Sequence, residues 1–134
     1  MKEILGDNIS DHLYRLIFYV KYGYTDEAKL DTHAVVRMGA YRKLGFTDEA
    51  KCDEDHPIRK EAYRFLGYTE DAKSDSDETI RLEAYRQLGF TDEAKYDSYR
   101  PIRMGAYRFL GFTEEAKSDD YDNIRKEADI YFSI

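Results

Sequence analysis

The chain has 134 residues, enough for one ordinary domain, and a formal net charge of −7. That balance argues against general affinity for nucleic acid or for anionic membranes, because both depend on Lys and Arg side chains. The first residues lack the apolar centre of a signal peptide, and no stretch approaches the about 20 apolar residues of a membrane span. We therefore expect no membrane contact. The single cysteine, Cys52, cannot form an internal disulfide and favours a cytoplasmic setting.

A sequence motif recurs along the chain at a fixed spacing. It reads AYRKLGFTDEAK from Ala40 and returns, slightly varied, at Ala62, Ala84 and Ala106, so each copy follows the last by 22 residues. A period of this length is typical of repeats that pack on their neighbours. We predict an all-α fold, a right-handed α-solenoid of about six such repeats, each a long helix plus a short helical turn.

Degenerate copies at the two ends are expected to cap the stack. They read FYVKYGYTDEAK from Phe18 and ADIYFSI from Ala128. Terminal repeats diverge because each must cover a face that has no neighbour. We predict a single repeat domain over 1–134, with an N-terminal capping repeat at 1–30, four regular repeats at 31–117 and a truncated C-terminal capping repeat at 118–134.

The segment from 75 to 95 shows how one repeat is built. Ile80, Ala84 and Leu88 fall at the spacing of one helical face. Gly89 is expected to end the helix in a left-handed conformation. Thr91 is expected to act as the N-cap of a short helix or 3-10 segment, with its hydroxyl accepting a backbone N–H.

A single repeat offers few core side chains, so its stability must come from stacking. Pro57 and Pro101 lie where a helix start tolerates proline, and they mark two predicted helix starts. In the repeat that follows Pro57, the expected core residues are Ile58, Ala62, Leu66, Tyr68 and Ala72.

At the start of each predicted long-helix segment, an Asp is followed six residues later by an Arg, then by Ala and, in the four regular repeats, by Leu-Gly. The aspartates are Asp31, Asp53, Asp75, Asp97 and Asp119, and the arginines are Arg37, Arg59, Arg81, Arg103 and Arg125. This pattern resembles the second helix of HEAT repeats, and the resemblance implies a structural Asp–Arg ladder between repeats. A HEAT unit has two full helices, whereas the first is reduced here to TDEAK. In that respect the chain is similar to the leucine-rich-repeat-variant fold, which alternates α and 3-10 helices.

The repetition itself argues against catalysis. Carboxylate pairs such as Asp48-Glu49 recur in every repeat, whereas a catalytic pair needs one singular environment, so helix-start charge explains them better. Acidic loops such as 119–122 lack the Gly and the distal Glu of a calcium loop. Cys52 and His56 supply one C-x-x-x-H pair, fewer ligands than zinc requires. We predict a chain that is no enzyme and has no catalytic residues, no metal and no cofactor.

Side chains opposite the predicted core form the candidate partner-binding surface. It contains one arginine per regular repeat, expected outward-facing apolar side chains beside them and two phenylalanines. These residues are Arg42, Arg64, Arg86 and Arg108, then Met38, Leu82 and Met104, and then Phe65 and Phe109. The alternative is a solvated surface with Glu–Arg pairing. The adjacent tyrosines are expected to stack on the ladder arginines between repeats, with base stacking as the alternative; they are Tyr41, Tyr63, Tyr85 and Tyr107.

These features lead to one main functional hypothesis and two alternatives. The main hypothesis is a non-enzymatic, cytoplasmic protein-interaction module, an adaptor that binds a protein partner along its repeat surface. The first alternative is a small acidic phage or mobile-element protein that inhibits a host nucleic-acid-handling or defence enzyme. The second is direct nucleic-acid binding through the arginines of the candidate surface, which the net charge of −7 disfavours. The partner's identity and the oligomeric state stay open.

Overall fold

The computed structural model describes residues 11–133 and divides into two compact units, 1–67 and 68–134, each of which is described by itself. Throughout the described residues, α-helices alternate with short 3-10 helices, and there are no strands. Unit 1 contains α2 (Asp11–Tyr22), η1 (Asp26–Leu30), α3 (Ala34–Leu44), η2 (Asp48–Cys52) and α4 (His56–Leu66). Unit 2 contains η3 (Glu70–Ser74), α5 (Glu78–Leu88), η4 (Asp92–Tyr96), α6 (Arg100–Leu110), η5 (Glu114–Ser118) and α7 (Asp122–Ser133).

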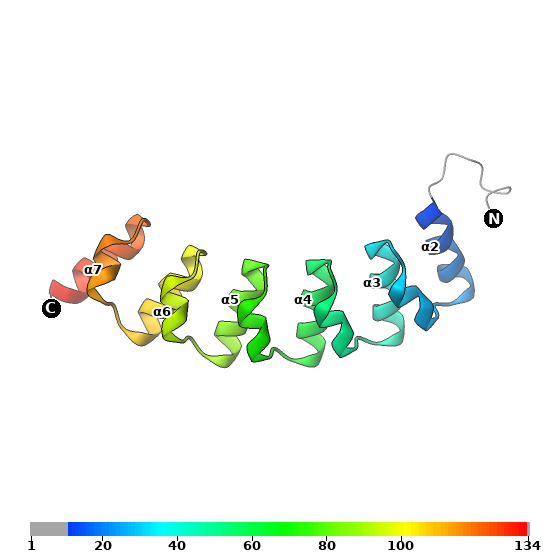
Figure 1. Ribbon diagram of the computed structural model, residues 1–134, viewed down its shortest axis with the longest axis horizontal. Coiled ribbons are helices and arrows are strands. Elements are labelled where there is room, and N and C mark those ends of the chain that lie inside the picture. The colour runs from blue at the N-terminus through cyan, green and yellow to red at the C-terminus, as the bar shows by residue number, and fades with distance from the viewer. Residues whose placement is uncertain (1–10, 134) are drawn as a thin grey trace. The chain divides into compact units, whose positions relative to one another are not determined.

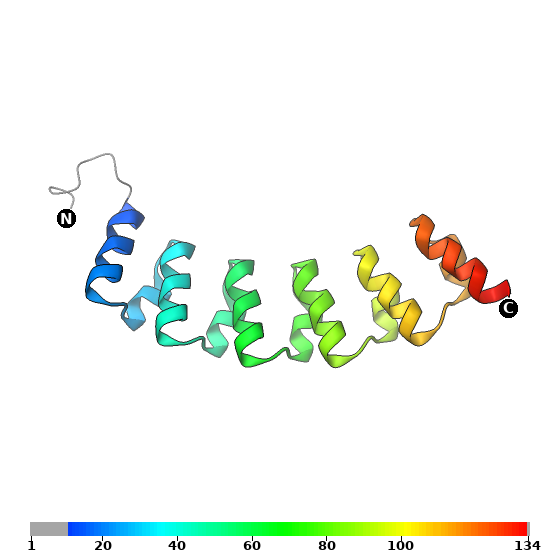
Figure 2. The same ribbon diagram turned by 180° about the vertical axis from the view of Figure 1, so that it is seen from behind.

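Each unit has two layers. The α-helices of unit 1 follow one another in chain order, and so do those of unit 2 (Figure 1). Figure 2 shows these long helices from behind, with the 3-10 helices on their other side. Each 3-10 helix packs on the α-helix that follows it. The predicted all-α repeat solenoid is confirmed as the fold class.

Glycine ends each α-helix that a 3-10 helix follows, at Gly23, Gly45, Gly67, Gly89 and Gly111. Gly45, for example, donates its N–H to the carbonyl of Tyr41 at 2.8 Å. Its φ is +107° and its ψ is +144°, so it lies outside the left-handed helical region that the sequence suggested. At positive φ, a ψ this large is almost confined to glycine. The turn therefore demands glycine more strictly than a simple helix stop would.

The helix starts combine proline with side-chain caps. Pro57 and Pro101 occupy the first turns of α4 and α6, as predicted. Asp77 caps α5 by accepting the backbone N–H of Ile80 at 3.0 Å. His33 caps α3 through Nδ1, which accepts the N–H of Val35 at 3.3 Å.

The threonines before the 3-10 helices do not cap them as predicted. Thr91 occupies the N-cap position of η4, but its side chain makes no capping hydrogen bond. Its carbonyl instead accepts the N–H of Ala94 at 3.0 Å. At the equivalent position in unit 1, Thr47 likewise makes no side-chain capping hydrogen bond, and its carbonyl accepts the N–H of Ala50 at 3.0 Å.

The core joins each 3-10 helix to the first two turns of the next α-helix. Ala50 of η2 packs with Ile58 and Ala62 of α4, and all three side chains are fully buried. Burying one Ile stabilises the fold by about 1.5–3 kcal/mol. Leu66, which the sequence placed in the core, lies in the last turn beyond this cluster and is 44% exposed. Tyr63, which directly follows Ala62 in α4, is buried, at 5% exposure.

Candidate functional site

Buried ion pairs link successive repeats within each unit. In unit 1, Arg37 of α3 donates from Nε and Nη2 to the two carboxylate oxygens of Asp53, both at 2.9 Å. Its Nη1 donates to the backbone carbonyl of Asp31 at 2.9 Å. Both charged side chains are more than nine-tenths buried. The same bidentate geometry joins Arg15 to Asp31, Arg81 to Asp97 and Arg103 to Asp119.

The aspartates of these pairs also order the following loop. Oδ1 of Asp31 accepts the backbone N–H of His33 at 2.8 Å, and Oδ1 of Asp119 accepts that of Tyr121 at 2.9 Å. The hydrogen bond from Arg15 is the largest cause that lowers the pKa of Asp31. Burial acts to raise the pKa of Asp119, but the hydrogen bonds from Arg103 and from Tyr121 lower it overall. These pairs stabilise the fold. Those of Arg37, Arg81 and Arg103 lie too deep to meet a partner, whereas the Arg15 side chain is 38% exposed.

Lysines rather than arginines cover the buried tyrosine rings. Nζ of Lys51 lies 5.3 Å from the ring centroid of Tyr63, and Nζ of Lys95 lies 5.8 Å from that of Tyr107. Each of these lysines also faces an exposed carboxylate of its own 3-10 helix, as Lys51 faces Asp48 at 3.7 Å. The tyrosines therefore make cation–π contacts with lysines, in place of the predicted stacking on ladder arginines.

The other face of the tyrosines meets aromatic residues. Tyr41 stacks on Phe46 with ring centroids 5.6 Å apart, and Phe46 stacks on Phe65 at 5.2 Å. Phe65 is 67% exposed. A matching stack in unit 2 joins Tyr85, Phe90 and Phe109. Each stack therefore runs from the core to a solvent-exposed phenylalanine.

The predicted arginines of the candidate surface are exposed. Arg42 and Arg108 pair with Glu61 and Glu127 of the next helix, at 2.6 Å from Nη2 in both cases. Arg64 is exposed on α4. Arg86 faces Glu83 of its own helix at 3.8 Å. Phe65 is exposed beside Arg64 in unit 1, and Phe109 is exposed beside Arg108 in unit 2; we call these six residues, taken in each unit by itself, the outer helix surface.

The apolar part of the candidate surface was placed wrongly by the sequence. Met104 is buried, at 7% exposure, and belongs to a core cluster with Tyr107 and Ile124. Met38 and Leu82 are half-buried and pack against core residues of their own units. The buried arc of the helix thus extends past the Ile and Ala positions, because the next repeat covers it.

Two repeats have glycine inside the α-helix. A Cβ added at Gly39 would lie 2.3 Å from Oη of Tyr24, and one at Gly105 would lie 2.4 Å from Cζ of Phe90. The missing side chain lets the aromatic ring lie directly on the helix backbone. A groove of about 600 Å³ opens beside Gly105 in unit 2, and grooves of about 500 and 560 Å³ flank Gly39 in unit 1.

No group of three or more His, Cys, Asp or Glu side chains within residues 11–133 is arranged to hold a metal ion. His12 and His33 stack with ring centroids 3.6 Å apart, and Cys52 is exposed. Within the same residues, no helix is long and apolar enough to cross a membrane.

Sequence reasoning missed Arg15 and the two internal glycines. Arg15 belongs to the degenerate first repeat, where the spacing of 16 residues to Asp31 was the available signal. For Gly39 and Gly105, the signal was Met-Gly where other repeats have Lys-Glu or Leu-Glu.

Comparison with known proteins returns no matching family model, no matching curated protein and no matching solved structure.

Proposed function

We propose that the chain is a non-enzymatic protein-interaction module that binds a protein partner through the outer helix surface. The observation that carries this proposal is the exposure of Phe65 and Phe109, at 67% and 77%. Each is held in place by an aromatic stack and lies next in sequence to an exposed arginine, Arg64 or Arg108. Aromatic and arginine side chains are the residues most enriched among binding hot spots.

The rigidity of these side chains supports the proposal. Phe65 stacks on Phe46, and Phe109 stacks on Phe90. Binding therefore costs these two side chains little further conformational entropy. A partner that covers such a ring gains apolar burial at about 25 cal/mol per Å².

The test is affinity capture from cells that make the chain naturally, followed by measurement of direct binding to the purified partner. We expect the double variant Phe65→Ser/Phe109→Ser to bind the partner at least tenfold more weakly than the unchanged chain, with unchanged helical circular dichroism. Leu30→Ser is the matched control, because Leu30 is 81% exposed but lies on η1. Equal binding by the double variant and the unchanged chain would disprove the proposal.

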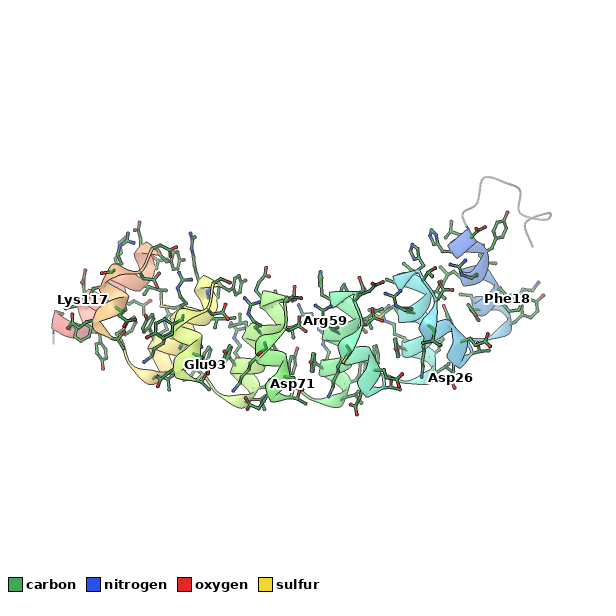
Figure 3. The ribbon with its side chains drawn as sticks, viewed as in Figure 1. Phe18, Asp26, Arg59, Asp71, Glu93 and Lys117 are labelled. Carbon is green, nitrogen blue, oxygen red and sulfur yellow. The ribbon has the colours of Figure 1, made fainter. Side chains whose placement is uncertain are left out.

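A second candidate function rests on the acidic 3-10 helices. The second acidic residues of η1 to η4 are exposed and make no ion pair within the described residues; they are Glu27, Glu49, Asp71 and Glu93. Figure 3 labels Asp71 and Glu93 on unit 2. Regularly spaced carboxylates of this kind fit the alternative of a phage or mobile-element inhibitor that occupies a nucleic-acid-binding groove.

Heparin chromatography tests that alternative. Host nucleic-acid-binding proteins are held on the column, and the purified chain is passed over them. An inhibitor should elute its target at low salt, and Glu49→Gln/Glu93→Gln should elute less. Direct nucleic-acid binding is checked separately by titrating labelled single-stranded DNA at low salt, where the absence of binding eliminates it.

We also propose that the repeats are related to HEAT repeats and that the protein is cytoplasmic. The bidentate pairs of Arg37 with Asp53 and of Arg103 with Asp119 support the first. The single cysteine supports the second, and fractionation of the native cells tests it.

A further inference from the structure

Gly105 occupies a position where other repeats carry a glutamate that receives an arginine. At this position in α4, Glu61 accepts Nε and Nη2 of Arg42, at 3.2 and 2.6 Å. In α7, Glu127 accepts the same two atoms of Arg108, at 3.0 and 2.6 Å. In both repeats, the arginine guanidinium thus forms a bidentate salt bridge with a glutamate carboxylate on the next helix.

Arg86 lacks that carboxylate. It stands on α5 at the position of Arg42 and Arg108, and the next helix offers Gly105 in its place. Its ion pair runs to Glu83 on its own helix, at a wide 3.8 Å, and its side chain is 60% exposed. Exposed pairs of this kind contribute little, so the guanidinium keeps its capacity for a bidentate acceptor.

The groove beside Gly105 provides an apolar floor next to this arginine. It lies between α5 and α6, within unit 2, and has a volume of about 600 Å³. Phe90 and Phe109 stack along it with ring centroids 5.3 Å apart. Its lining includes two arginines, Arg86 and Arg108, and no carboxylate, in a chain whose net charge is −7.

We propose that this groove binds an acidic peptide segment of the protein partner. A carboxylate side chain of that segment takes the place of the missing glutamate on Arg86, and a neighbouring apolar side chain lies against Phe90 and Phe109. The planar guanidinium matches a carboxylate with two parallel hydrogen bonds. The inference rests on the proposed function, and it specifies the chemistry of the partner.

The two grooves that flank Gly39 serve as internal controls. They share the Met-Gly sequence, but Val20 stands where Arg86 stands in unit 2; Asp55 lines one groove, and Val20 and Lys43 line the other. The one arginine of both grooves, Arg42, is already paired with Glu61, and the point charge of a lysine does not offer the bidentate geometry of a guanidinium. An acidic segment therefore has no arginine to meet there.

The first test is a titration of the full ¹⁵N-labelled chain, followed by NMR. The probe is the synthetic peptide acetyl-Gly-Phe-Glu-Leu-Gly-amide, and the matched probe has Gln in place of Glu. We expect the Gly105 amide and the Arg86 Nε–H signals to shift with the first peptide, and the Gly39 amide to stay in place. The Gln peptide should bind at least tenfold more weakly. Equal binding of both peptides, shifts confined to other residues, or no shift at 10-fold to 100-fold peptide excess would each overturn the inference.

Two variants sharpen the result. Gly105→Glu supplies the carboxylate from within the chain. A Cβ at this position would lie 2.4 Å from Cζ of Phe90, so the Phe90 ring must shift, and helical circular dichroism checks that the variant stays folded. Both this variant and Arg86→Gln should bind the Glu peptide at least tenfold more weakly. Arg64→Gln is the control, because Arg64 does not line this groove.

The natural partner separates this inference from the proposed function. If Gly105→Glu binds the captured partner as tightly as the unchanged chain does, the groove inference is wrong and the proposed function stands. If the unchanged chain captures no partner, the proposed function fails, and the peptide titration still decides what the groove binds.

Discussion

Arg37 shows how a charged side chain can be buried in a small repeat. Its guanidinium donates to both carboxylate oxygens of Asp53 and to the carbonyl of Asp31. A buried ion pair is tolerated only when such bonds offset the loss of solvation. No buried side-chain nitrogen or oxygen in the described residues lacks a hydrogen-bond partner.

Replacing Arg37 with Ala should destabilise the chain strongly, because it leaves the Asp53 carboxylate buried without its partner. We expect the free energy of unfolding to fall by about 3–5 kcal/mol. Arg42→Ala removes an exposed pair with Glu61 and should cost less than about 1 kcal/mol. Urea unfolding monitored by circular dichroism measures both values, and similar losses in the two variants would contradict the interpretation.

The lowered pKa of Asp31 predicts an acid-sensitive contribution to stability. A carboxyl whose pKa is lower in the folded chain stabilises it fully above the unfolded pKa, about 3.9, and loses that contribution as pH falls through the folded pKa. The difference in unfolding free energy between the unchanged chain and Asp31→Asn should therefore be constant above about pH 5 and shrink below about pH 4. Denaturant titrations from pH 6 to pH 2.5 measure it, and a difference that grows on acidification would refute the assignment.

At this scale, the sequence predicted some positions and missed others for identifiable reasons. The spacing of Ile58 and Ala62 directly reflects the buried helical face. Met104 was predicted to face outward because a helical wheel describes a single helix and leaves out its neighbours. The burial of Met104 comes from its contacts with the next repeat. The sequence also did not reveal that Arg86 pairs with Glu83 of its own helix. That pairing depends on the next helix, where Gly105 supplies no carboxylate.

The helices themselves were largely predictable from the sequence, but the conformation of the turns that link each α-helix to the following 3-10 helix was not. The alternation of long and short helices follows from Leu-Gly and TDEAK, and α5 ends at Leu88 beside Gly89 as expected. The sequence could not reveal that Gly89 has a ψ of +142°, because glycine permits several positive-φ conformations. The same turn determines that Thr91 accepts a hydrogen bond through its backbone carbonyl and does not cap η4 with its side chain.

The turn at Gly45 predicts that Gly45→Ala lowers the free energy of unfolding through backbone strain alone. A Cβ at Gly45 would meet no atom within 4 Å, so no steric clash contributes. The φ of +107° should nevertheless cost about 1–3 kcal/mol of unfolding free energy, because a side chain rarely adopts it. Urea unfolding of this variant beside Gly45→Asn checks the result. A neutral effect of the Ala variant would show that the turn relaxes.

At the scale of the whole molecule, the helices described within each unit pack against elements adjacent to them in the chain. In unit 1, α3 lies between α2 and α4 in chain order, and in unit 2, α6 lies between α5 and α7. Repeat proteins of this kind derive stability from the repeat and from its interfaces with adjacent repeats. A helix with two neighbours should open less often than a helix with one.

Native-state hydrogen exchange tests that expectation. Amides in the middle of α3, such as that of Ala40, should exchange at least tenfold more slowly than amides such as that of Ile17 in α2. Within unit 2, the amide of Ala106 in α6 should likewise exchange more slowly than that of Ala128 in α7. Uniform protection along either unit would instead indicate that the unit opens as a whole.

The ladder also constrains how the gene can change length. Arg15, Arg37, Arg81 and Arg103 each meet an aspartate 16 residues ahead, so removing one complete repeat leaves the offset intact. Deleting residues 38–59, for example, brings Asp75 to the offset from Arg37 that Asp53 held. Recombination between the nearly identical AYR-LG-TDEAK segments yields such products directly. Shortened and lengthened forms of the protein should therefore keep their pairing, whereas insertions of any other length break it.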